Sequence, residues 1–535
     1  MANEPTITFS RPLQRILGSF QKQPAAVKDE SGSKIHVSDA VSRLASVYEK
    51  FRNIIDYKEE HLLRKNAIHR IIKRRMLTGG TGASVARTLI IELIQAQYLP
   101  NDEIAESKVT AVSEIIDRYL ALSRYAGETL NWPDRDEQHR WLLGLSAVEI
   151  EQTLSSYHKD KAVADAMYEV LTEDMVIAGD TKIDQQVKNL QIYLAVQRAL
   201  LKADETMVAY ALFRLHLPDW HAMDATAVQN LGSRFAQVRD EMDDQQYHPL
   251  GEFFLRYAKR YTSFFWIIRD VAEEHPSAAL HTFASPEILD EAVRRAGGRR
   301  YTEARVKLRR SIIRSFIFIF LTKMLLALVL EVPFELYVKG VIDRMTLGIN
   351  IIFHPMLMFL IASTIRVPSK KNTDKLIQGI HEIAYKNAGR QLLRRAKLPT
   401  QRGPVRKSAV AILYGATFVI TFGLIGYGLA RLGFNFVSGA LFVFFLTIVS
   451  FFAVRIRISA REFVVLDQHE GPFGFFIDFF TIPVLRVGRW IALRAPKVNI
   501  MLFIFDFLIE APFKSFLAIL EELTSFLREK KEEIS

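Results

Sequence analysis

The sequence predicts an all-α protein, namely a polytopic α-helical membrane protein with a large N-terminal helical cytosolic domain. Residues 1–300 are largely polar and place apolar residues at helical spacing, without a convincing period of two. Residues 301–535 contain apolar runs close to the ~20 residues that a helix needs to cross ~30 Å of hydrocarbon. The first part of the chain is therefore predicted to fold in water and the second part in a lipid bilayer.

The chain carries a formal net charge of +11, and the location of this charge decides its meaning. Arg294–Arg310 and Arg366–Lys407 carry net charges of +7 and +10, so the rest of the chain is net −6. Both basic stretches adjoin apolar runs, where the positive-inside rule and attraction to anionic headgroups explain them. Since the sequence has no zinc-finger spacing or RNA-binding aromatic motif, we expect a lipid bilayer with anionic headgroups as a partner and no nucleic acid.

The N-terminus lacks the apolar core of a secretory signal peptide. Residues 1–33 are predicted to form a flexible basic tail. An organellar presequence is the alternative, because residues 6–28 carry Arg and Lys without an acidic residue. The chain has no cysteine, which excludes disulfides, thiolate metal sites and cysteine nucleophiles.

The cytosolic domain is predicted to span residues 34–300 and to consist of helices joined by short turns. Turn signals such as Asn131-Trp132-Pro133 and Leu217-Pro218-Asp219 separate apolar stretches at helical spacing. The predicted helices cover residues 37–77, 83–98, 107–124, 136–158, 161–177, 184–201, 205–215 and 250–274.

Four apolar runs form two predicted transmembrane hairpins. Residues 301–365 hold the first pair of runs, Ser311–Leu330 and Leu347–Ile365, and residues 408–460 hold the second, Ser408–Leu429 and Phe434–Val454. Basic residues flank both ends of each hairpin, which predicts cytosolic flanks. Between the hairpins, residues 366–407 are predicted to be a basic cytosolic segment with an amphipathic helix at the membrane surface.

The C-terminal apolar stretches are interrupted by Asp, Glu, Lys and Pro. We interpret residues 461–520 as amphipathic, re-entrant or transmembrane segments, which gives four to six spans in total. Residues 521–535 are predicted to be a charged tail.

The sequence lacks motifs that carry catalytic chemistry. Thr78–Gly82 lacks the Lys-Ser/Thr of a P-loop and follows a helical pattern, which favours a helix-to-helix turn. His61 and His69 have acidic neighbours, but interleaved Arg and Lys favour salt bridges over a metal site. Without a zinc-protease or Gly-x-Ser-x-Gly motif, we predict no cofactor, no metal and no catalytic residues. An intramembrane enzyme stays open as a third hypothesis, because its residues need to meet only in space.

Eight ionisable residues in or beside the apolar runs are the candidate site residues: Lys323, Glu331, Glu335, His354, Asp478, Asp506, Glu510 and Lys514. A charge inside a span, such as Lys323, costs at least about 2.5–3.5 kcal/mol unless it is paired or reaches the interface. Glu331 lies eight positions further on and about 80° around a regular helix, so direct pairing requires a bend near Pro333. Asp478 and Asp506 are alternative partners for Lys323.

A local internal resemblance bears on the same residues. Residues 330–335 (LEVPFE) match residues 509–514 (IEAPFK), each at the end of an aromatic-rich apolar run. Proline frees a backbone carbonyl and the carboxylate adds an acceptor, as in the broken helices that line some transport sites. A helix that simply leaves the membrane has the same sequence character.

These features predict a membrane-anchored scaffold or interaction protein, without enzymatic activity, that binds a protein partner or itself through residues 34–300. The alternative is a transporter or channel subunit with an intramembrane charged pathway. The predicted location is the membrane of a bacterial cell, with the N-terminal domain in the cytosol, or else an organellar inner membrane.

The first testable prediction is that the full-length protein sediments with membranes. After lysis without detergent and ultracentrifugation, we expect the chain in the pellet, because its apolar runs are too long for a water-soluble core. Recovery of the full-length chain in the supernatant would contradict both the topology and the two favoured functions.

Overall fold

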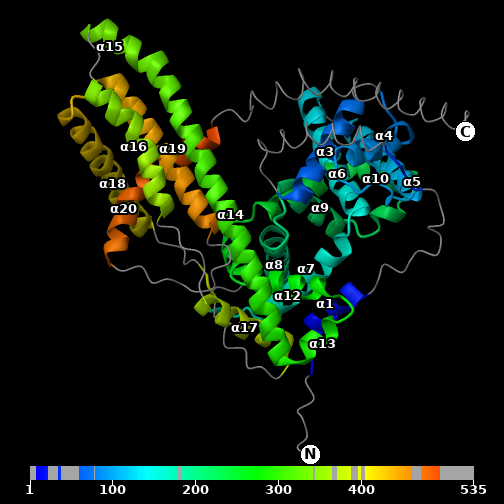
Figure 1. The fold of residues 1–535 in the computed structure, drawn as a ribbon. Coiled ribbons are helices and arrows are strands. Elements are labelled where there is room, and N and C mark those ends of the chain that lie inside the picture. The colour runs from blue at the N-terminus through cyan, green and yellow to red at the C-terminus, as the bar shows by residue number, and fades with distance from the viewer. Residues whose placement is uncertain are drawn as a thin grey trace, which may run out of the picture. The chain divides into compact units, whose positions relative to one another are not determined.

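The computed structural model of the protein describes residues 8–21, 34–37, 59–76, 79–128, 131–178, 183–340, 344–363, 370–386, 396–398, 404–460 and 472–494. The chain divides into two compact units. Unit 1 comprises residues 1–280, 382–398 and 498–535, and unit 2 comprises residues 281–381 and 399–497. Helices dominate both units, which confirms the predicted all-α fold (Figure 1).

Unit 1 is a cluster of short and medium-length helices around one apolar core. The core is built by side chains of α3 to α6, α9 and α10, with Tyr119, Phe213, Trp220 and Phe235 in contact at its centre. The elements of unit 1 are α1 (Arg11–Gln21), α3 (Glu60–Met76), α4 (Gly82–Gln95), α5 (Ser107–Gly127), α6 (Trp132–Leu154), α7 (Tyr157–Asp174), β1 (Ile177–Ala178), α8 (Gln185–Ala199), α9 (Glu205–His216), η1 (Trp220–Ala222), α10 (Ala225–Gln246), α11 (Gly251–Lys259), α12 (Thr262–Glu274) and β2 (Ala396–Lys397), with α13 (Ala279–Ala284) at the boundary.

A buried carboxylate organises the centre of this core. Glu149, which is 2 % exposed, accepts hydrogen bonds from Tyr119 Oη at 2.8 Å and Trp220 Nε1 at 3.1 Å. Burial, reinforced by the Glu149 charge, raises the pKa of Tyr119 well above its usual value, so this phenol stays a hydrogen-bond donor at neutral pH. One oxygen of the buried carboxylate, Oε2, is thus satisfied by aromatic donors from two other elements.

The N-terminal segment corrects one expectation. Residues 1–33 were expected to be a flexible tail, but residues 11–21 form α1, which packs against α7 and α12. Leu13, Ile16, Leu17 and Phe20 are buried because their spacing places them on one helix face. Arg11 and Arg15 lie near Glu169 of α7, at 3.7 and 3.2 Å. The basic residues of this segment therefore belong to a packed helix.

Most predicted helices of unit 1 are present, with two differences. The predicted helix at residues 250–274 is divided into α11 and α12, and α10 occupies residues that the sequence analysis left unassigned. The pattern of α10 does contain a signal, because Val228, Leu231, Phe235 and Met242 are buried at helical spacing. Thr81 and Ser84 form a capping box at the start of α4, as expected for a helix-to-helix turn.

Unit 2 contains the long apolar helices. Its elements are α14 (Pro286–Leu326), η2 (Ala327–Glu331), α15 (Val332–Lys339), α16 (Arg344–Ser363), α17 (Lys370–Ala384), α18 (Pro404–Arg431), α19 (Phe436–Ala460) and α20 (Pro472–Arg494). In Figure 1, α14 runs the length of this unit in green, with α16 and α19 beside it. Among the described residues, four helices are long and apolar enough to cross a membrane, in Pro286–Tyr337, Arg344–Ile361, Ser408–Arg431 and Phe436–Ile458.

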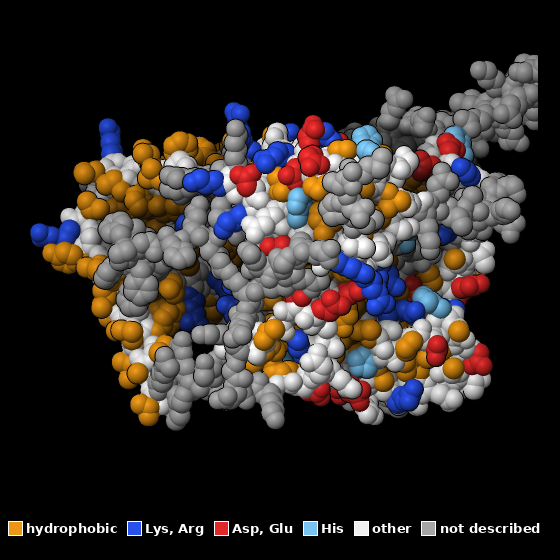
Figure 2. Space-filling view, turned by 90° about the horizontal axis from the view of Figure 1, so that it is seen from below, with side chains coloured by type: hydrophobic (Ala, Val, Ile, Leu, Met, Phe, Trp, Pro, Cys, Tyr) orange, Lys and Arg blue, Asp and Glu red, His pale blue; other side chains and the backbone are white. Residues whose placement is uncertain are grey.

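The apolar helices expose much of their apolar surface. Phe318, Ile352, Ile412, Val419 and Leu424 are each more than 60 % exposed, which is unusual for a protein surface that faces water. Figure 2 shows hydrophobic side chains gathered over the part of the molecule that these helices form. A bilayer would remove this surface from water.

The first long helix, α14, is basic in its N-terminal part and apolar in its C-terminal part. The predicted domain boundary at residue 300 falls inside α14, whose basic N-terminal part contacts α17. Arg294 pairs with Asp374 at 3.0 Å, His381 Nε2 lies 2.8 Å from Asp290, and Asn372 donates to Tyr301 Oη at 2.8 Å. The apolar stripe of α17, which was predicted to face a membrane surface, includes Leu376 and Ile380, and both are fully buried. The predicted bilayer contact of this stripe stays a prediction.

The C-terminal helix of unit 2, α20, packs against α18 and α19. Close approach is possible because Gly488 has no side chain: a Cβ at this position would lie 2.1 Å from the Thr447 carbonyl oxygen. Small residues let the backbones of apolar helices approach in this way. Residues 472–494, part of the segment predicted to be amphipathic, re-entrant or transmembrane, form a packed helix, and the relation of this helix to a bilayer stays a prediction.

The second prediction concerns this helix contact. We expect Gly488→Ala to destabilise the folded protein by about 1–3 kcal/mol, because the added methyl group forces α20 away from α19. Thermal unfolding of the detergent-solubilised protein measures the effect. Gly426→Ala is the matched control, since a Cβ there meets no atom within 4 Å. Equal midpoints for the two variants would contradict the predicted contact.

Candidate functional site

A line of buried polar side chains runs between α14–α15, α16 and α19, and we name it the polar column. Its buried members are each at most 1 % exposed. Glu331 and Glu335 lie four residues apart, as do Asn350 and His354, which places each pair on one helix face. The polar column consists of Lys323, Glu331, Glu335, Asn350, His354 and Ser438, with Asn435 at its end.

A π turn sets the first face of the column. Pro333 cannot donate a backbone hydrogen bond and its ring crowds the carbonyl one turn earlier, and the preceding residues 327–331 form η2, a π-helical turn. A π turn accommodates one extra residue. Glu331 therefore lies where a residue seven positions after Lys323 would lie, about 20° around the helix instead of about 80°. Both side chains consequently point into the same buried space.

Glu331 is held by an amide from the neighbouring helix. The Nδ2 atom of Asn350 lies 2.8 Å from each carboxylate oxygen of Glu331 and 3.5 Å from the Ser438 carbonyl oxygen on α19. A carboxylate only accepts hydrogen bonds when ionised, so an amide nitrogen is the matching partner. This contact links three helices through one buried group.

His354 lies one turn further along α16. Its Nε2 atom lies 2.9 Å from the Phe442 carbonyl oxygen of α19, and its Nδ1 atom lies 3.1 Å from the Asn350 carbonyl oxygen. The Phe442 and Phe445 rings lie 4.7 and 5.8 Å from the imidazole, measured between centroids. The imidazole is thus enclosed by aromatic rings and faces two acceptors.

Lys323 lies at one end of the column, opposite the end formed by Glu335 and Asn435. Its Nζ atom lies 4.5 Å from the centroid of the Phe445 ring and has no hydrogen-bond partner among the described residues. The same part of the chain leaves Asn350 Oδ1 and Ser438 Oγ without partners. Buried polar atoms without partners are uncommon, and a water molecule or a bound ion would satisfy them.

Glu335 and Asn435 form the opposite end of the column. Asn435 Nδ2 donates to Glu335 Oε1 at 3.2 Å, while Asn435 Oδ1 accepts from the Ser438 backbone N–H at 2.8 Å and so caps α19. The N-terminal end of α19 carries a partial positive charge that favours the nearby carboxylate. From Lys323 to Glu335 the helix rises about 18 Å, more than half of a ~30 Å hydrocarbon layer.

Beyond Lys323 the same three helices become apolar. Ile319, Met358, Val449 and Ala453 form a buried cluster, which we name the apolar plug. Ile319 precedes Lys323 by one turn and Met358 follows His354 by one turn, so the plug continues the line of the column. The buried interior is therefore polar at one end and apolar at the other.

The structure brings together four of the eight candidate residues, namely Lys323, Glu331, Glu335 and His354. Asp478 lies in α20, but its side chain is outside the described part of the chain, as are Asp506, Glu510 and Lys514. Sequence analysis missed Asn350, Asn435 and Ser438, because amides and hydroxyls carry no charge. A signal was present at Asn350, which is a strong hydrogen-bonding group in an apolar run one turn before His354.

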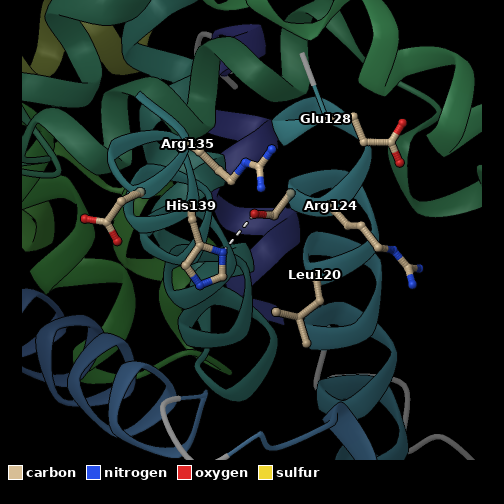
Figure 3. Close-up of a pocket in the computed structure, with 7 residues that line it drawn as sticks. Leu120, Arg124, Glu128, Arg135 and His139 are labelled. Carbon is tan, nitrogen blue, oxygen red and sulfur yellow. Dashed lines mark hydrogen bonds between the residues drawn. The ribbon is translucent and has the colours of Figure 1, made fainter. Parts of the chain in front are cut away.

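Unit 1 contains a second polar site, a pocket of about 440 Å³ between α5 and α6 (Figure 3). Ser123 Oγ lies 2.8 Å from His139 Nδ1, and burial lowers the pKa of His139. A serine nucleophile also needs an oxyanion hole of free backbone N–H groups. Ser123 lies within α5, where those groups donate within the helix, so the pair is an interhelical hydrogen bond.

Acidic residues near His61 form ion pairs with basic side chains. Among the described residues, no three His, Asp, Glu or Cys side chains form a group that could hold a metal ion. Arg64 instead donates to Glu151 at 2.7 Å, and Lys202 donates to Glu59 at 2.9 Å. Comparisons with protein families, with curated proteins and with solved structures found no match to this chain.

The third prediction tests how Glu331 is stabilised. We expect Asn350→Leu to destabilise the protein by about 3–5 kcal/mol, because it leaves a buried carboxylate without its donor. The double variant Asn350→Leu/Glu331→Leu should recover much of this loss, since two apolar side chains need no donor. Thermal unfolding in detergent measures both variants. Purely additive effects of the two substitutions would show that the contact does not couple them.

Proposed function

We propose that the protein moves a small cation, a proton included, across a membrane through the polar column, as a transporter or channel subunit. The observation that carries this proposal is the convergence of Lys323, Glu331, Glu335 and His354 in one buried line. Ionisable groups in an apolar layer are costly and commonly mark ion or proton pathways. Dispersed charges that reach the headgroups would have supported an anchor instead.

Energetics favours transport over simple anchoring. An anchor needs apolar helices and basic flanks only, and each buried ionisable group lowers its stability unless that group is paired. Among its described residues, the unit instead contains a lysine without a hydrogen-bond partner and a carboxylate held by one amide. Such an incomplete polar set supports a site that a mobile ion or proton completes.

The two ends of the column suggest how access is controlled. Glu335 and Asn435 lie beside the connection between α18 and α19, whereas the apolar plug blocks the line beyond Lys323. Hydrophobic constrictions close ion pathways by excluding water. With the basic flanks on the cytosolic side, the column opens away from the cytosol and the plug separates it from the cytosol.

The scaffold function predicted from the sequence stays a prediction. A helical unit that binds a protein partner or itself is compatible with transport, because many channels and transporters carry such units. A pull-down with the full-length protein that recovers neither a stable partner nor self-association would count against it. The polar column, which an anchor does not need, leads us to prefer transport.

The fourth prediction is a flux measurement. Purified protein in proteoliposomes should pass protons or a monovalent cation down an imposed gradient, and Glu331→Gln should lower this flux at least about tenfold. Glu303→Gln is the matched control, because it makes the same change at an exposed position of α14 and should leave flux unchanged. Absence of flux in the wild type, or unchanged flux in Glu331→Gln, would overturn the proposal.

A further inference from the structure

We propose that the species bound in the polar column is the proton, and that His354 is the residue that accepts it. This inference rests on the proposed function and adds the identity of the transported species. Three observations support the inference: the hydrogen-bond acceptors around the imidazole ring, the groups beside Glu331, and the charged residues of the column.

Both nitrogens of His354 face hydrogen-bond acceptors. The Phe442 carbonyl oxygen lies 2.9 Å from Nε2 and the Asn350 carbonyl oxygen lies 3.1 Å from Nδ1. A neutral imidazole has one N–H, so it donates to one carbonyl and turns a lone pair toward the other. The protonated ring has two N–H groups and donates to both. The geometry therefore suits the imidazolium form without any movement of the side chain.

The two carbonyls belong to different helices, so the proton affects helix packing. The Asn350 carbonyl lies within α16, whereas the Phe442 carbonyl belongs to α19. When the neutral ring carries its proton on Nδ1, the contact between the two helices loses its hydrogen bond. Protonation restores this bond. For this tautomer, proton binding is coupled to the contact between α16 and α19, one turn from the apolar plug.

The column is poorly suited to a metal cation. Metal cations such as Ca²⁺ require several oxygen ligands around one point. The carboxylate of Glu331 is instead covered by an amide nitrogen, and the Lys323 ammonium occupies one end of the column. A proton needs one lone pair only, which the imidazole supplies.

The charged groups of the polar column on the adjoining elements are Lys323 of α14, Glu331 of η2 and Glu335 of α15. Among its described residues, α19 presents Phe442, Phe445 and Ser438 on this side and no charged group. In the proposed step, a hydronium ion from water at the Glu335 end transfers its proton to the ring nitrogen that carries no proton and leaves as water. The same proton later returns to water on the other side.

The fifth prediction tests this assignment in proteoliposomes with a pH-sensitive dye inside. Under a proton gradient, we expect His354→Gln to lower the proton flux at least about tenfold, because glutamine donates a hydrogen bond but does not titrate. His281→Gln, at an exposed histidine, should match the wild type. His354→Asn is a second variant for the case that glutamine prevents folding.

A second measurement does not depend on flux. Nitrogen-15 NMR of histidine-labelled protein in bilayers should show one signal that is missing from the variant and that changes from neutral to protonated as the pH is lowered. Wild-type flux of Na⁺ or K⁺ without proton flux, or unchanged proton flux in both variants, would overturn the inference while leaving transport intact. A wild type that passes no ion would overturn the proposed function itself.

Discussion

A carboxylate buried among apolar helices needs donors from its immediate surroundings, and this requirement organises unit 2. Glu331 obtains its donor from Asn350, whose amide also faces the backbone of α19. That contact aligns the inner face of α16, which brings His354 onto the same line. The π turn before Pro333 is equally necessary, because a regular helix would turn Glu331 away from Lys323. Local backbone geometry and one amide thus determine which side chains meet.

Unit 1 meets the same requirement in a different way. Glu149 lies in the apolar core of unit 1 and accepts hydrogen bonds from Tyr119 and Trp220. Both donors are neutral, and their rings pack against each other. His221 Nδ1 lies 3.1 Å from the other carboxylate oxygen. This arrangement fixes the positions of α5, α6 and η1, so we assign Glu149 a role in stabilising the fold. The polar column differs because its cation has no hydrogen-bond partner in the described part of the chain. A buried cation in an apolar layer is costly, and this cost favours a functional explanation for the polar column.

The proposed proton site joins charge to helix packing. His354 belongs to α16 and its Nε2 atom faces a carbonyl of α19, so protonation of the Nδ1–H tautomer adds a hydrogen bond between the two helices. The apolar plug lies one turn away on the same helices. A small change at the imidazole is therefore well placed to alter the packing of Met358 and Val449, because closely packed interiors respond to side-chain shifts as units.

The sequence alone determined the all-α character and the positions of the apolar helices, because hydrophobic periodicity and run length are local properties. It also identified Lys323, Glu331, Glu335 and His354, since charged groups stand out in apolar runs. It did not identify α1 as a packed helix, because burial of Leu13 and Phe20 depends on α7 and α12. Only the tertiary structure decided that the four ionisable groups share one column and that Asn350, Asn435 and Ser438 complete it. The reason is physical: hydrogen bonds between residues 19, 88 or 100 positions apart depend on helix packing, and a single sequence carries no direct record of that packing.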